Sequence, residues 1–134
     1  MAKALSRILA VEDEPDIRSV LELCLRSLGG FTVLSCASGE EALGQAEAFA
    51  PDLLLLDVMM PSLDGPDTLR ALRKRPPLAQ VPAIFLTAKV RPQELQQLRE
   101  LGAAGVVAKP FDPATLCGEI ERIWAGAQRE DLHG

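Results

Sequence analysis

The sequence predicts one α/β domain built around a parallel β-sheet. Apolar runs of strand length alternate along the chain with segments whose apolar residues recur at helical spacing, which is typical of successive βα units. The length of 134 residues suits a single domain, and no repeat, low-complexity tract or linker divides the chain. We therefore expect one sheet with helices packed on both of its faces.

The first two units have clear sequence boundaries. A strand at residues 8–11 should be followed by a helix from Pro15 to Leu28, because proline suits the first helical turn and Gly29-Gly30 can end a helix. A strand at 32–36 leads to a second helix, where Ser38 and Glu41 have capping-box spacing. The apolar residues expected on the inner face of the first helix are Ile17, Val20, Leu21, Cys24, Leu25 and Leu28.

The remaining strands and helices are predicted from apolar runs rich in leucine and from the positions of proline and glycine. Four consecutive leucines in the third strand, 53–57, suit a strand covered on both faces. The third helix should open at Gly65-Pro66, and a fourth strand is expected at 83–86. A weakly apolar fourth helix at about 92–101 should precede a fifth strand at 105–108. The inward residues expected from the last three helices are Leu69, Leu72, Leu95, Leu98, Leu101, Leu116, Ile120, Ile123 and Trp124.

Right-handed crossovers between five such units favour the strand order 2-1-3-4-5, which is the flavodoxin-like, doubly wound arrangement with five flanking helices. In that order a ligand binds at the carboxyl ends of strands one and three, where the winding direction changes. Glu12 and Asp13 follow the first strand, and Asp57 ends the third. The predicted topology therefore brings these carboxylates together.

The composition excludes several classes of function. A net charge of −5 argues against nucleic acid and anionic membrane surfaces as partners. The one basic cluster (Arg70, Arg73, Lys74, Arg75) is interpreted as a solvated helix face and end. Three dispersed cysteines and a single histidine, His133, argue against disulfides and mixed Cys/His metal sites. With no membrane-spanning run or secretion signal, a cytoplasmic protein is expected.

The residues at the strand ends could together handle phosphate. They comprise the carboxylates of Glu12, Asp13 and Asp57, the hydroxyl of Thr87 and the ammonium of Lys109. Crowded carboxylates resist joint ionisation unless a cation intervenes, and Mg²⁺ suits a site with few protein ligands. Each residue taken alone has an ordinary explanation, such as a favourable charge at a helix N-terminus or a surface lysine at a strand exit. The interpretation depends on all of them converging.

Four motifs resemble the receiver domain of two-component response regulators from Arg7 to about Ala125. Each motif is modest alone, but their order and spacing together are highly specific. We accordingly place a receiver domain at residues 1–126 and a polar tail, expected to fray, at 127–134. The matching stretches are Val11-Glu12-Asp13-Glu14, Leu56-Asp57-Val58-Met59-Met60-Pro61-x-x-Asp64-Gly65, Leu86-Thr87-Ala88 and Lys109-Pro110-Phe111.

The resemblance implies that Asp57 accepts a phosphoryl group from a histidine kinase or a histidine phosphotransfer protein. Thr87 and Lys109 would contact that group, and the small Ala88 would leave room for it. The implied Mg²⁺ ligands are Asp13, Asp57, the backbone carbonyl of Met59, and Glu12 directly or through water. A turnover enzyme is not expected, because aspartyl phosphatases of similar fold commonly carry a general-acid aspartate where this chain has Met59.

One departure from the family pattern leaves the readout open. Val106 stands where the family commonly places an aromatic residue, and valine has no comparable rotamer switch. One interpretation is a phospho-switch that controls a downstream protein target, or a homodimer, through the face of the fourth helix, fifth strand and fifth helix. The alternative is a receiver-like protein-binding module with a weak phospho-switch or none. No output domain is expected within this chain, which could be a stand-alone receiver or part of a longer protein.

Overall fold

The computed structural model describes residues 4–133, with side chains as far as residue 128. The predictions for the first three residues, for Gly134 and for the side chains of the polar tail, including His133, lie outside this description. Among the described residues, no helix has the length and apolar character needed to cross a bilayer.

Within residues 4–133, five strands alternate with five α-helices as predicted. The strands are β1 (Arg7–Val11), β2 (Thr32–Cys36), β3 (Leu53–Asp57), β4 (Ala83–Thr87) and β5 (Gly105–Ala108). The helices are α1 (Pro15–Leu23), α2 (Gly39–Phe49), α3 (Gly65–Arg73), α4 (Pro92–Glu100) and α5 (Leu116–His133). Two short segments, η1 (Cys24–Leu28) and η2 (Pro76–Leu78), are π-helical and 3₁₀-helical. All strand pairs are parallel in the order β2-β1-β3-β4-β5, which confirms the predicted topology.

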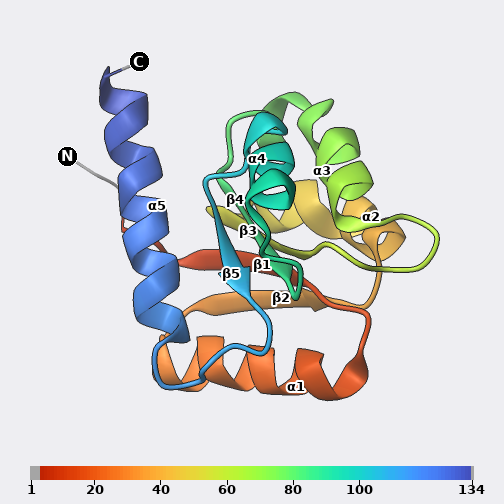
Figure 1. Ribbon diagram of the computed structural model, residues 1–134, viewed down its shortest axis with the longest axis vertical. Coiled ribbons are helices and arrows are strands. Elements are labelled where there is room, and N and C mark those ends of the chain that lie inside the picture. The colour runs from red at the N-terminus through yellow and green to blue at the C-terminus, as the bar shows by residue number, and fades with distance from the viewer. Residues whose placement is uncertain (1–3, 134) are drawn as a thin grey trace.

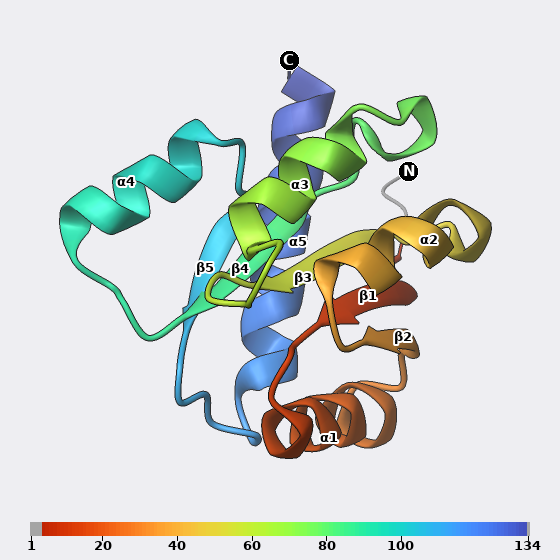
Figure 2. The same ribbon diagram turned by 90° about the vertical axis from the view of Figure 1, so that its right-hand side faces the viewer.

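The sheet lies between two layers of helices (Figures 1 and 2). Helices α1 and α5 cover one face, and α2, α3 and α4 cover the other. Successive side chains on a strand point to opposite faces. Leu53 and Leu55 therefore join the core under α1 and α5, whereas Leu54 and Leu56 join the core under α2 and α3. This alternation explains why the four consecutive leucines of β3 are all fully buried.

The first helix differs from the prediction over its last turn. Residues Cys24–Leu28 form a π-turn, in which the Gly29 N–H donates to the Cys24 carbonyl at 3.1 Å. A π-turn contains more residues than an α-turn, so the apolar spacing no longer keeps one face inward. Leu28, in this turn, is 66% exposed. Val20 lies in α1 before the turn, beside the loop after β5, and is 44% exposed. The prediction that both face the core was wrong.

Helices α2 and α3 each begin at a residue whose side chain caps the helix. Ser38 caps α2 as predicted by accepting a hydrogen bond from the Glu41 N–H at 3.1 Å. The Glu41 carboxylate accepts from the N–H of Ala37, one residue before the cap, at 3.1 Å, so the return bond of the predicted capping box reaches a neighbouring residue and not Ser38 itself. Asp64 caps α3 by accepting from the Asp67 N–H at 2.8 Å. Helix α4 has no side-chain cap, and Leu98 is its one buried residue. Helix α4 therefore adds few buried side chains to the core.

The basic cluster is only partly a solvated face. Arg73 donates to the carbonyls of Leu78 and Val81, and Arg75 donates to the carbonyl of Leu43. These two guanidinium groups therefore bind the loop after α3 and the Leu43 carbonyl within α2. Arg70, in contrast, is exposed and pairs with Asp67 in its own helix. The interpretation of the whole cluster as solvated is corrected for Arg73 and Arg75, because their guanidinium groups donate to backbone carbonyls of neighbouring segments.

Helix α5 closes the core under β1 and β5. Leu116, Ile120 and Trp124 are buried as predicted, and the Trp124 indole N–H donates to the Asp52 carbonyl at 3.3 Å. The helix continues to His133, past the boundary at 126 that the sequence suggested for the domain. That boundary, and the fraying of the tail, remain predictions. Cys24 and Cys36 are buried free thiols, and Cys117 is half-buried.

Gly65 permits the close approach of α3 to the end of β3. A Cβ atom at this position would clash with the Asp57 carbonyl oxygen and lie 3.0 Å from Val58 Cα. Gly65→Ala should therefore lower the free energy of unfolding by about 1–3 kcal/mol, measured by urea denaturation. Gly44→Ala, in open space on α2, is the matched control and should raise stability by about 0.5–1 kcal/mol. Equal effects of the two substitutions would contradict the steric explanation.

Candidate functional site

The carboxyl ends of four neighbouring strands meet at one edge of the sheet. Val11 is in register with Leu56, so the residues that follow them, Glu12 and Asp57, lie side by side. Thr87 is in register with Ala108, which places the next residue, Lys109, across from the end of β4. The predicted convergence of these four side chains at one edge is thus a feature of the structure.

Lys109 joins the ends of three strands. Its ammonium Nζ lies 2.8 Å from Glu12 Oε1 and 3.2 Å from Asp57 Oδ1. Glu12 is completely buried and Asp57 is 2% exposed, whereas the Lys109 side chain is 15% exposed. The Lys109–Pro110 peptide bond is cis. The lysine is therefore a half-buried partner of two buried carboxylates and not a solvated lysine at a strand exit.

The electrostatics of the site are not balanced by that one ammonium. Burial, followed by the charge of Glu12, raises the pKa of Asp57 to about 7, although Lys109 acts in the opposite direction. Burial alone would lower the pKa of Lys109, but its hydrogen bonds and the charges of Glu12 and Asp57 outweigh burial and raise it. The site therefore holds a permanent cation beside an aspartate that binds its proton unusually well.

Asp13 completes a group of carboxylates that could hold a metal ion. One ligand oxygen each from Glu12, Asp13 and Asp57 lies within 4.8 Å of the others. Asp13 Oδ1 is buried, yet it makes no hydrogen bond within the part of the chain that the structure describes. Buried polar atoms normally have partners, and oxygen ligands with excess negative charge suit Mg²⁺. The donor set thus fits a small divalent cation.

The loop that carries Glu12 and Asp13 is held from inside the site. Glu12 Oε2 accepts a hydrogen bond from the Glu14 N–H at 3.2 Å. Arg18 Nη1, on α1, donates to the backbone carbonyl of Glu12 at 3.0 Å and to that of Asp13 at 3.3 Å. Arg18 was not predicted as a functional residue, because an arginine in the first turns of an amphipathic helix usually faces solvent. Its only signal was its position one turn after the acidic motif.

The residues assigned to the switch lie around the same edge. Thr87 is 2% exposed, and its hydroxyl accepts a hydrogen bond from the Lys89 N–H at 3.0 Å. Ala88 is exposed next to it. Val106 is half-buried on β5 and packs against the core under α2 and α3. The Met59 side chain is 61% exposed, so only its backbone can belong to the buried part of the site.

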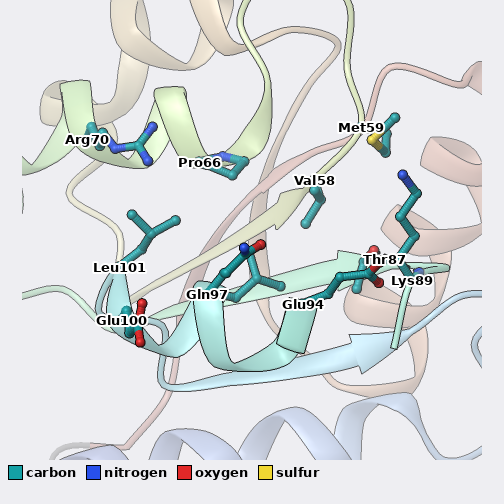
Figure 3. Close-up of a pocket in the computed structure, with 11 residues that line it drawn as sticks. Val58, Met59, Pro66, Arg70, Thr87, Lys89, Glu94, Gln97, Glu100 and Leu101 are labelled. Atoms are coloured by element: carbon teal, nitrogen blue, oxygen red, sulfur yellow. Dashed lines mark hydrogen bonds between the residues drawn. The ribbon is translucent and has the colours of Figure 1, made fainter. Parts of the chain in front are cut away.

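A groove runs from this edge between α3 and α4 (Figure 3). Its volume is about 580 Å³, and Met59, Thr87 and Lys89 line the end nearest the carboxylates. Arg70 on α3 and Glu100 on α4 line the far end. The groove reflects the sparse anchoring of α4, because few of its side chains fill the space beside the sheet. Thr87 therefore lies between the carboxylate cluster and the groove beside α4.

The raised pKa of Asp57 has a consequence for stability. Between the ordinary aspartate pKa of about 4 and a pH of about 7, the folded protein keeps a proton that the unfolded chain has released. The free energy of unfolding should therefore fall as the pH rises through this interval. Asp57→Asn should remove this loss and stabilise the metal-free protein at pH 8 by about 1–3 kcal/mol, with less gain at pH 5.

Urea denaturation in EDTA at both pH values measures this effect. Asp16→Asn, which replaces an exposed acid in the first turn of α1, is the control and should change stability by no more than about 0.5 kcal/mol. If Asp57→Asn leaves the unfolding free energy at pH 8 unchanged, the carboxylate is not destabilised by its surroundings and the electrostatic account is wrong.

Comparisons with known proteins agree with this geometry. A family model described as the response regulator receiver domain matches residues 8–121. The chain is 41% identical over 117 residues to a probable transcriptional regulator, ycf27, of Porphyridium aerugineum, covering 87% of this chain and 47% of that protein. It is 38% identical to the Bacillus subtilis regulator PhoP, covering 87% of this chain and 48% of that protein. The chain thus spans about half the length of the curated relatives it matches.

Solved structures give the same result. Chemotaxis protein CheY4 of Vibrio cholerae superposes with a TM-score of 0.83 at 32% identity, over 90% of this chain and 99% of that one. The receiver domain of the sensor histidine kinase PA1611 from Pseudomonas aeruginosa has a TM-score of 0.79 at 35% identity, over 91% and 99% of the two chains. That domain was solved with a magnesium ion coordinated in its active-site cleft. The chain belongs to the receiver-domain family of two-component response regulators.

Proposed function

We propose that this receiver takes a phosphoryl group onto Asp57 and uses the resulting change to switch protein contacts. The observation that carries the proposal is the convergence of three carboxylates with one half-buried ammonium, which is in direct contact with Asp57. The receiver domain of PA1611 supports Mg²⁺ as the resident ion, because it was solved with that ion in its cleft. In this chain Glu12, Asp13, Asp57 and the Met59 backbone carbonyl would hold it.

In the proposed transfer, an Asp57 carboxylate oxygen forms a bond to the phosphorus of a phosphohistidine. The phosphorus–nitrogen bond breaks, and its electron pair stays on the leaving imidazole. Lys109, already 3.2 Å from Asp57, would turn from the carboxylate to the transferred phosphoryl oxygens. Bound Mg²⁺ would neutralise charge on those oxygens, as is general for phosphoryl transfer. No residue donates a proton to the leaving group, which fits Met59 at the position where related phosphatases carry an acid.

The donor would be a histidine kinase or a histidine phosphotransfer protein in the cytoplasm. An apolar hollow of about 440 Å³ opens beside Lys109, between α1 and the loop after β5. Ile17, Val20 and Phe111 line it, so a partner helix could place its phosphohistidine near Asp57 while burying the exposed Val20. We propose that the chain is a phospho-acceptor that catalyses its own modification and slow dephosphorylation, without turning over a free substrate.

The proposed readout passes through Thr87 to α4. Thr87 would release the Lys89 N–H and donate its hydroxyl to the phosphoryl group, which would draw the loop after β4 inward. Ala88 would leave room for the group. The sparse packing of α4 supports a shift of this helix, so a downstream target or a second copy of the chain would sense the face formed by α4, β5 and α5. Val106 packs without an aromatic ring and favours a weaker switch, which keeps the protein-binding module as the second candidate.

Phosphate uptake tests the acceptor assignment. Incubation with acetyl phosphate should add one phosphoryl group in the presence of Mg²⁺ and none in EDTA, measured by intact mass. Asp57→Asn should abolish uptake. Asp64→Asn is the matched control, because asparagine also caps a helix and Asp64 lies outside the carboxylate cluster. Uptake by Asp57→Asn would assign the acceptor to another residue.

The roles of Lys109 in phosphoryl transfer and in the conformational response can be tested separately from metal binding. Lys109→Ala should retain Mg²⁺ binding but lose at least about tenfold in phosphorylation rate, because one cation near the phosphoryl oxygens is missing. Amide chemical shifts of Thr87 and Ala88 should then respond little to beryllofluoride, a phosphoryl mimic. Lys74→Ala, an exposed lysine that follows α3, is the control. A full shift response without Lys109 would contradict its role, and solution size with beryllofluoride would distinguish a homodimer from a separate target.

A further inference from the structure

Arg18, beside the carboxylate cluster, donates its hydrogen bonds to backbone carbonyls and not to carboxylates. It is half-buried on α1, and its Nη1 atom donates to two backbone carbonyls, those of Glu12 and Asp13. The same two residues carry carboxylates of the cluster, and a guanidinium group normally prefers a carboxylate, with which it can form two parallel hydrogen bonds. The arginine therefore fixes the main chain of the acidic loop without occupying its carboxylate oxygens.

The contact matters most for Asp13. Both carboxylate oxygens of Glu12 are held, one by Lys109 and the other by the Glu14 N–H. Asp13 Oδ1 is buried without a hydrogen-bond partner among the described residues. Within the same part of the chain, the bond from Arg18 to the carbonyl is the one side-chain hydrogen bond that residue 13 receives. The direction of the Asp13 carboxylate thus depends on how firmly its own backbone is held.

We propose that Arg18 is a positioning residue for the metal site. By holding the carbonyls of residues 12 and 13, it keeps the Asp13 carboxylate aimed at Asp57 and leaves its oxygens available to the ion. Lys109 differs, because it bonds the carboxylate oxygens of Glu12 and Asp57 themselves. Contacts that orient a metal ligand typically change affinity by about 10–100-fold when removed. The inference rests on the proposed binding of Mg²⁺, and it adds a residue outside the ligand set.

The chain offers a matched control for a purely structural effect. Arg26, in the π-turn that follows α1, also donates to a backbone carbonyl, that of Val33, at 2.8 Å. It pairs in addition with Glu22 at 3.1 Å. Removing Arg26 therefore deletes the same kind of contact on the same side of the sheet, but not at the acidic loop.

Mg²⁺ titration followed by amide chemical shifts tests the inference on the full chain. Arg18→Met should weaken Mg²⁺ affinity by about tenfold. Arg18→Lys, which keeps a charged donor, should recover part of that loss, and Arg26→Met should bind Mg²⁺ like wild type. In metal-free protein, hydrogen exchange should quicken at the amides of residues 13 and 14 in Arg18→Met alone.

Several results would overturn the inference. Wild-type Mg²⁺ affinity in Arg18→Met would remove the positioning role and leave the proposed function intact. An equal loss in Arg26→Met would reduce the effect to general destabilisation, and urea denaturation of each variant would measure that. If the wild-type protein itself binds no Mg²⁺, the proposed function fails first, and this inference fails with it.

Discussion

The contact of the Lys109 ammonium with two buried carboxylates is the interaction on which the rest of the site depends. It joins the end of β5 to the ends of β1 and β3, across 97 and 52 residues of sequence. Burying Glu12 and Asp57 without a cation would be costly, since charges withdrawn from water need partners. The ammonium makes their burial possible, and the parallel sheet makes the ammonium available at that edge.

The single ammonium of Lys109 does not balance the charge of the carboxylates around it. One ammonium faces two buried carboxylates and a third nearby, so Asp57 keeps a pKa of about 7 and Asp13 Oδ1 has no hydrogen-bond partner among the described residues. A site with this excess of acceptors is poorly stabilised by itself and gains most from a bound cation. The same imbalance that weakens the empty fold therefore favours binding of a metal ion.

The structure around the site is closely packed beside α3 and sparsely packed beside α4. Gly65 allows α3 to approach the Asp57 backbone closely, Arg73 bonds a carbonyl of the loop after α3, and Arg75 bonds a carbonyl of α2. On the other side of Thr87, α4 is anchored by one buried leucine and borders an open groove. The groove leaves space beside Thr87 on the side of α4, whereas the densely packed core on the other side transmits displacement. Val106, half-buried on β5, offers no ring to lock such a displacement.

The sequence by itself determined the strands, their order and the convergence of Glu12, Asp57, Thr87 and Lys109. Apolar runs mark strands, right-handed crossovers restrict their order, and parallel strands bring their carboxyl ends to one edge. Only the tertiary structure decided the π-turn that exposes Leu28, the carbonyl contacts of Arg73 and Arg18, and the Asp13 oxygen that has no hydrogen-bond partner among the described residues. Those features depend on which polar groups packing brings within reach of one another, and such contacts leave no periodic signal in the sequence.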